Sequence, residues 1–149
     1  MIVIASDHAG YELKRQIAAA LDGLGVPYRD LGVTDPSPTD YPDLAHAVAV
    51  EIASGRAERG VLICGTGIGM SMAANRHRGV RAALCHDTFT AEMARRHNDA
   101  NVLCLGGRVL GAGVAAHILE KFLATDFEGG RHQRRVAKIE YPGEEECDA

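Results

Sequence analysis

The sequence contains no long apolar run and no paired cysteine motif. Residues 1–6 are apolar, but no basic region precedes them and charged residues follow at once at Asp7 and Glu12. We therefore expect neither a signal peptide nor a membrane span. Cysteines occur at positions 64, 85, 104 and 147 without a CxxC spacing. This spacing argues against a disulfide framework and against a thiol redox protein, and it favours a cytoplasmic setting.

Metal-binding and nucleotide-binding patterns are also missing. The seven histidines show neither HxxxH nor HExxH spacing, so the working assumption is a protein that uses no metal and no other cofactor. A net charge of −4 argues against a general affinity for nucleic acid. Basic residues nevertheless gather between Arg131 and Lys138, where a local anion site is possible.

The 149 residues, 46% of them hydrophobic, are enough for one domain, 1–149, with an acidic tail at about 141–149. Short apolar runs alternate with helical periodicities along the chain. We expect strands at 2–5, 28–31, 60–64, 80–85 and 101–105, and helices at 11–24, around 44–52, 69–75, 88–96, 111–123 and 130–138. The alternation predicts an α/β fold, a Rossmann-like three-layer α/β/α sandwich with a five-stranded parallel sheet.

The segment from Ile63 to Ser71 carries the strongest chemical signal. A buried strand ends at Cys64, and glycines follow at every second position, Gly65, Gly67 and Gly69. The pattern fits neither GxGxxG on a first strand nor the GxxxxGK loop, because no lysine follows. Backbone N–H groups of such a loop can face an anion next to the thiol. The alternative is a tight turn that merely needs glycine. We interpret Cys85 and Cys104 as small buried hydrophobes.

Three other groups have both a structural and a functional interpretation. Asp7 and His8 follow the first strand, where one can cap the next helix and His8 can contact a ligand. His97 and Asn98 end a helix, where Asn98 can be a left-handed cap or His97 can transfer a proton. Arg131 and Arg135 share a helix face, which is either solvated or, with Arg108, a phosphate clamp.

Several ordered motifs resemble ribose-5-phosphate isomerase type B, a sugar-phosphate isomerase family that includes galactose-6-phosphate isomerase subunits. The resemblance runs from the first strand to about Lys138. It rests on Ser6-Asp7-His8-Ala9-Gly10, Asp40-Tyr41-Pro42-Asp43, Cys64 to Gly69, Ala73-Ala74-Asn75, His97-Asn98-Asp99-Ala100-Asn101 and Glu128-Gly129-Gly130-Arg131-His132.

The resemblance implies interconversion of D-ribose 5-phosphate and D-ribulose 5-phosphate through a cis-enediolate. Cys64 would be the base and His97 would open the sugar ring. Met70 stands where a second subgroup carries a glutamate base, which leaves Cys64 as the base. The implied substrate-binding residues are Asp7, His8, Tyr41, Gly65, Thr66, Gly67, Ile68, Gly69 and Asn98 for the sugar and the reaction intermediate, and Arg108, Arg131 and Arg135, with His132, for the phosphate.

The resemblance further implies a homodimer or homotetramer with active sites at the subunit interface, and a phosphorylated sugar as the partner, with no nucleic acid or membrane. Two alternatives stay open. The substrate could be another sugar phosphate, such as galactose 6-phosphate, allose 6-phosphate or a tetrose phosphate. The chain could instead be a noncatalytic module that binds a phosphate-bearing ligand, as the glycine loop and the arginines alone would allow.

Overall fold

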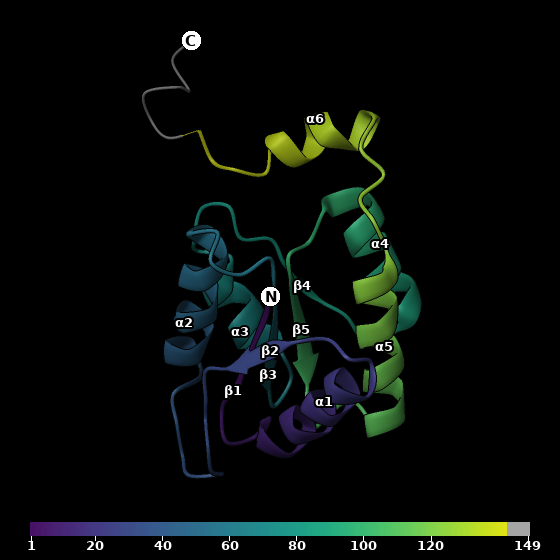
Figure 1. The fold of residues 1–149 in the computed structure, drawn as a ribbon. Helices are drawn as coiled ribbons and strands as arrows, with labels where there is room; N and C mark the ends of the chain where they lie inside the picture. The colour runs from purple at the N-terminus through teal and green to yellow at the C-terminus, as the bar shows by residue number, and fades with distance from the viewer. Residues whose placement is uncertain (143–149) are drawn as a thin grey trace.

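Five strands alternate with helices along the chain and form one parallel sheet (Figure 1). The structure, a computed structural model, describes residues 1–142, and the expectation for the acidic tail beyond them lies outside the described residues. The sheet order is β2-β1-β3-β5-β4. The elements are β1 (Ile2–Ser6), α1 (Tyr11–Gly23), β2 (Tyr28–Asp30), α2 (Tyr41–Ala53), β3 (Arg59–Cys64), α3 (Ile68–Ala74), β4 (Ala82–Leu84), α4 (Thr88–Asn98), β5 (Val102–Gly106), α5 (Ala112–Ala124) and α6 (Arg131–Ala137).

The predicted three-layer α/β/α sandwich is confirmed, with β2 one residue and β4 three residues shorter than expected. The sequence predicts a strand over 80–85, whereas β4 covers Ala82–Leu84. The Asn101 side chain accepts the N–H of Arg81, and the Asn75 side chain bonds both backbone groups of Ala82. At Arg81, directly before β4, a side chain therefore satisfies the backbone N–H in place of a strand partner.

Alternate residues of each central strand face opposite helix layers, as the strand period of two requires. On one face, Ile4, Ile63 and Leu105 pack with α1, α4 and α5, and on the other face Ala5 and Leu62 pack with α2 and α3. The helices supply apolar residues at helical spacing. Each fully buried Leu or Ile stabilises the fold by about 2 kcal/mol relative to an exposed side chain. In residues 1–142, no helix is long and apolar enough to cross a membrane.

The ends of the strands define two sides of the parallel sheet, here called the carboxyl edge and the amino edge. All five strands point the same way, so their ends lie together at the carboxyl edge, at the bottom of Figure 1. The helix that connects β4 to β5 runs in the opposite direction, so α4 ends at the amino edge, toward the top of the view. After the last strand, α5 also runs back toward this edge, and the Leu123 carbonyl near its end accepts a hydrogen bond from Arg59, the first residue of β3. The last helix, α6, lies beyond this amino edge.

Lys14 joins α1 to the segment after β2. Its side chain is only 2% exposed, and its Nζ donates hydrogen bonds to Asp30 Oδ1, at 2.8 Å, and to the Val33 carbonyl oxygen. A buried ammonium group needs such partners because it has left water. The segment that it holds continues to Thr39, whose N–H donates to the side chain of His8, shortly after the end of β1.

We expect Lys14→Met to lower the free energy of unfolding by about 1–3 kcal/mol, because the Val33 carbonyl loses its charged donor while the aliphatic stem is kept. The matched control is Arg15→Met, which removes an exposed pair with Glu12 and should cost less than about 0.5 kcal/mol. Urea denaturation measures both values. Equal losses in the two variants would contradict the role given to Lys14.

Candidate active site

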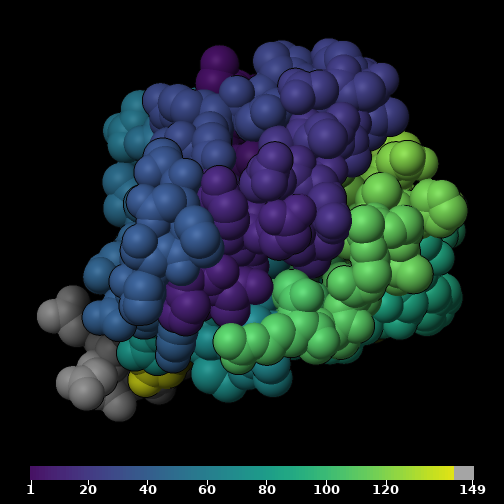
Figure 2. Space-filling model, turned by 90° about the horizontal axis from the view of Figure 1, so that it is seen from below, coloured from purple at the N-terminus to yellow at the C-terminus, as the bar shows by residue number. Residues whose placement is uncertain are grey.

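Three strand ends meet at the carboxyl edge, because β1, β3 and β5 are neighbours in the sheet. The segments that follow them are joined by backbone hydrogen bonds. Asp7 N–H donates to the Ile63 carbonyl at 3.2 Å, and Gly107 N–H donates to the Cys64 carbonyl at 2.8 Å. Figure 2 views this edge from below and shows the N-terminal segment, in purple, between the blue segment that enters α2 and the green segment after β5.

Two glycines allow this close approach. A Cβ atom at Gly10 would lie 2.3 Å from the Ile63 carbonyl oxygen, and one at Gly107 would lie 2.7 Å from the Ala9 carbonyl oxygen. Both obstacles are backbone atoms, which cannot rotate away as a side chain can. Glycine is therefore required at both positions for the three segments to pack as they do.

Cys64 sits at the centre of this edge. It ends β3, is 5% exposed, and its Sγ accepts a hydrogen bond from Gly67 N–H at 3.1 Å. Gly67 adopts a left-handed conformation, with φ of 80°, and Ile68 N–H donates to Thr66 Oγ1 at 3.2 Å as α3 begins. An N–H group directed at sulfur interacts more favourably with a thiolate than with a thiol. The Gly67 N–H fixes the direction of the Cys64 sulfur at the start of the loop.

The other two described cysteines are packed in the core. Burial raises the pKa of Cys85 to about 11 and raises the pKa of Cys104 well above its ordinary value. Both are neutral thiols at physiological pH and face apolar neighbours. Their interpretation as small hydrophobes is confirmed, and Cys64 differs from both in lying next to the glycine loop.

Tyr41 and Arg108 lie against the glycine loop. A Cβ atom at Gly69 would be 2.5 Å from a ring carbon of Tyr41, so the tyrosine ring occupies the space that a side chain would take. A Cβ atom at Gly65 would be 3.3 Å from Nη1 of Arg108, whose backbone N–H also donates to the Gly65 carbonyl at 2.9 Å. The loop thus brings an aromatic hydroxyl and a guanidinium to the same edge.

Asp7 and His8 complete the carboxyl-edge group. Asp7 is buried and accepts Gly10 N–H at 3.0 Å, so it caps the turn before α1, while Gly10 itself is the N-cap residue and has no side-chain cap. His8 is exposed, and its Nδ1 accepts Thr39 N–H at 3.1 Å. In the neutral ring the proton is then on Nε2, which is free to donate to a ligand.

The remaining site residues of the sequence prediction lie at the amino edge. His97 and Asn98 are the last two residues of α4, and Arg131 and Arg135 belong to α6. Figure 1 shows these elements at the end of the molecule opposite to the carboxyl edge. One chain therefore does not bring Arg108 together with Arg131 and Arg135. The left-handed residue at the end of α4 is Asp99, with φ of 46°, and not Asn98.

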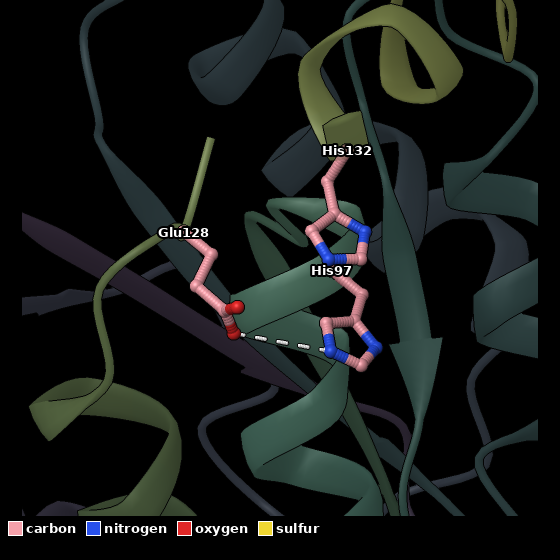
Figure 3. A group of neighbouring side chains, drawn as sticks. All are labelled: His97, Glu128 and His132. Carbon is pink, nitrogen blue, oxygen red and sulfur yellow. Dashed lines mark ion pairs between the residues drawn. The ribbon is translucent and has the colours of Figure 1, made fainter. Parts of the chain in front are cut away.

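His97 lies next to both a carboxylate and a second imidazole (Figure 3). Its Nε2 is 3.9 Å from Glu128 Oε2, and its ring is nearly parallel to that of His132, with centroids 4.3 Å apart and planes 11° apart. Burial, followed by the neighbouring His97 and Arg131, lowers the pKa of His132, so this ring is neutral at pH 7. Sequence reasoning assigned no role to Glu128, although its motif Glu128-Gly129-Gly130 was visible.

These three side chains are the group in residues 1–142 that comes nearest to a metal site. Their ligand atoms lie within 4.8 Å of one another, and the His97–Glu128 distance is 3.9 Å. Tetrahedral zinc, with bonds of about 2.0–2.1 Å, requires ligand atoms roughly 3.3 Å apart. The spacing is too wide for a preformed zinc site.

A groove of about 710 Å³ also opens at the amino edge. Its lining includes Arg76, Arg81, Asn98 and Tyr141, and it does not include Cys64. This groove is thus separated from the thiol, although catalytic groups normally lie in a pocket. The carboxyl edge and the amino edge of the sheet therefore each hold only part of the predicted site.

Comparisons with known proteins agree on one family. A model described as Ribose/Galactose Isomerase matches residues 2–139. A putative sugar phosphate isomerase of Bacillus subtilis is 50% identical over 139 residues, which are 93% of each chain. Ribose-5-phosphate isomerase B of Escherichia coli is 45% identical over 138 residues, again 93% of each chain. The crystal structure of a ribose 5-phosphate isomerase from Thermotoga maritima matches with a TM-score of 0.91 and 51% identity, covering 93% of this chain and 95% of that one.

We expect Gly67→Ala to destabilise the protein by about 2–4 kcal/mol, because it adds left-handed strain and places a Cβ atom 2.6 Å from Leu84 Cδ1 and 3.0 Å from the Leu105 backbone. Gly79→Ala is the matched control, since Gly79 has φ of 83° but nothing within 4 Å of an added Cβ. The control should cost about 1–2 kcal/mol in chemical denaturation. Identical losses would show that close packing does not constrain the loop.

Proposed function

The chain belongs to the ribose/galactose isomerase family, and on this basis we propose that it is an enzyme that interconverts D-ribose 5-phosphate and D-ribulose 5-phosphate. Its substrate class is accordingly the phosphorylated sugars. The observation that carries the proposal is the position of Cys64, whose sulfur accepts Gly67 N–H where three strand ends meet. This arrangement can remove a proton next to a carbonyl and stabilise the charge that results.

In the proposed reaction, Cys64 as a thiolate takes the proton from C2 of the open-chain aldose. The electron pair of the C–H bond forms the C1=C2 double bond, and the carbonyl electrons move to O1. A proton then passes from O2 to O1 of the cis-enediolate. Cys64 returns its proton to C1 as the C2 carbonyl forms, which gives the ketose. N–H groups of the loop from Gly65 to Gly69 stabilise the enediolate oxygen.

The furanose ring must open before this proton transfer. We assign His97 to this step. It gives a proton to the ring oxygen as the bond from C1 to that oxygen breaks, and the C1 hydroxyl releases a proton to solvent as the aldehyde forms, which allows His97 to be protonated again. The residues that orient the sugar are Asp7, His8, Tyr41, Thr66 and Asn98. Those that hold the phosphate are Arg108, Arg131 and Arg135.

We also propose that the active enzyme is a homodimer or a homotetramer. The proposed base lies at the carboxyl edge, whereas His97, Asn98 and two of the arginines lie at the amino edge of the same chain. A site that contains both groups therefore needs the carboxyl edge of one copy and the amino edge of another. A two-fold arrangement satisfies this need twice and closes the assembly.

A cytoplasmic location is part of the proposal. Cys64, Cys85 and Cys104 are free thiols in the structure. A base that works as a thiolate is preserved in a reducing compartment, because oxidation would remove its basic electron pair.

We expect the purified protein to convert ribose 5-phosphate to ribulose 5-phosphate, and Cys64→Ala to lower kcat by roughly a thousandfold or more, because no other group replaces the base. Sugar-phosphate binding should persist, since the arginines are unchanged. Cys85→Ala is the control, because Cys85 is a buried neutral thiol, and it should keep most of the activity. Normal turnover by Cys64→Ala would exclude Cys64 as the base. If the wild type is inactive on ribose 5-phosphate but active on a hexose or tetrose phosphate, that sugar phosphate is the substrate instead.

A shared site predicts complementation between inactive variants. Cys64→Ala and His97→Asn subunits, unfolded together and refolded as an equal mixture, should recover about a quarter of wild-type activity. Half of the dimers would then be mixed, and each mixed dimer would contain one intact site of two. The rate of ribose 5-phosphate isomerisation measures the recovery. If the mixture is no more active than its separate components, each site is built from one chain.

A further inference from the structure

The end of α4 is held in a strained backbone conformation. Asp99 has φ of 46° and ψ of 43°, and it is the one residue other than glycine with a positive φ in residues 1–142. Its N–H donates to the Arg95 carbonyl at 3.2 Å, and Ala100 N–H donates to the Ala94 carbonyl at 2.9 Å. Glycine would adopt this turn without strain. The presence of an aspartate indicates that the side chain is needed there.

The Asp99 carboxylate lies between two arginines. Its Oδ1 accepts from Arg95 Nη1 at 2.8 Å, and its Oδ2 accepts from Arg81 Nη2 at 3.2 Å. Arg81 also donates from Nε to the Asp99 carbonyl oxygen at 2.9 Å. Charge-assisted hydrogen bonds therefore fix both the side chain and the backbone of this residue.

The two arginines connect the end of α4 to other elements. Arg95 is 6% exposed, and it donates to the Ala100 carbonyl at 2.6 Å and to the carbonyl of Thr125, after α5, at 3.2 Å. Arg81 directly precedes β4, and its N–H is held by the Asn101 side chain. Asp99 thus joins the end of α4 to the start of β4 and the end of α5.

His97 and Asn98 are the two residues directly before this turn. Both belong to the last turn of α4, whose carbonyl groups lack helical partners, so the order of this turn depends on the bonds made at its end. A misplacement of about 1 Å in a reacting group can cost roughly a hundredfold in rate. The direction of both side chains depends on where and how α4 ends.

We propose that Asp99, held by Arg81 and Arg95, is a positioning residue for the ring-opening step. It fixes the final turn of α4 and thereby the direction of His97 and Asn98, and it acts through these residues without touching the sugar. This inference rests on the role proposed for His97.

Two assays on the intact enzyme separate ring opening from proton transfer. Ribulose 5-phosphate is open-chain, because its C5 oxygen carries the phosphate and cannot close a furanose ring. Exchange of its C1 hydrogen with deuterated solvent, followed by NMR, therefore needs Cys64 but no ring opening. Turnover of ribose 5-phosphate needs both steps. We therefore divide kcat/KM for ribose 5-phosphate by the exchange rate measured with the same enzyme. This ratio falls when ring opening is impaired. It does not depend on the amount of folded enzyme, because both rates are proportional to that amount.

Asp99→Asn should lower this ratio by roughly 10- to 100-fold, because the neutral amide no longer holds both arginines and the last turn of α4 loosens. Glu51→Gln is the matched control. Glu51 likewise accepts from two arginines, Arg29 and Arg56, but it lies on α2. The control should leave the ratio unchanged even if it lowers stability. An unchanged ratio in Asp99→Asn would overturn the inference.

Two further variants make the outcome decisive. His97→Asn should lower the ratio strongly; if it does not, the role proposed for His97 is wrong, and the inference about Asp99 is wrong with it. If His97→Asn lowers the ratio but Asp99→Asn does not, only the inference about Asp99 is wrong. Arg81→Met removes one of the two arginines that hold the Asp99 carboxylate, at a partly exposed position. It tests the inference if Asp99→Asn does not fold. It should lower the ratio in the same direction by a smaller factor.

Discussion

Backbone packing between the ends of β1, β3 and β5 is the constraint on which the carboxyl edge depends. The Cys64 carbonyl accepts Gly107 N–H, and the Cys64 sulfur accepts Gly67 N–H, so the residue is held through both its backbone and its side chain. The first bond requires that no side chain separate Gly107 from Ala9. A thiol at the end of an ordinary strand would rotate freely. Here its direction is set by backbone groups that cannot move independently of the sheet.

The same parallel arrangement separates the two halves of the proposed site. Residues that follow a strand lie at the carboxyl edge, and residues that end a connecting helix lie at the amino edge. Cys64 and His97 are therefore far apart in one chain for a topological reason, which no side-chain rotation can remove. The proposed oligomer would remove this separation, because the carboxyl edge of one copy can face the amino edge of another.

The sequence was sufficient to predict the element order, the parallel sheet, the position of Cys64 and the structural role of Cys85 and Cys104. These depend on local periodicity and on the rule that strand ends gather at one edge. It was insufficient for the end of α4, where Asn98 was a possible left-handed cap and Asp99 is the residue that adopts the conformation. The deciding partner, Arg81, is 18 residues away, and its contact with Asp99 exists only after the sheet has formed. Glu128 was missed for the same reason.

The two halves of the site differ in how their rigidity is achieved. At the carboxyl edge, glycines leave room for backbone segments to hold one another, and the proposed base, Cys64, is the last residue of a strand. At the amino edge, a helix end has carbonyl groups without helical partners, so its geometry must come from side chains. Asp99 accepts backbone strain there, and the bonds from Arg81 and Arg95 offset it. In the proposed oligomer, each half is rigid in itself, so the contact between subunits would set the distance between Cys64 and His97.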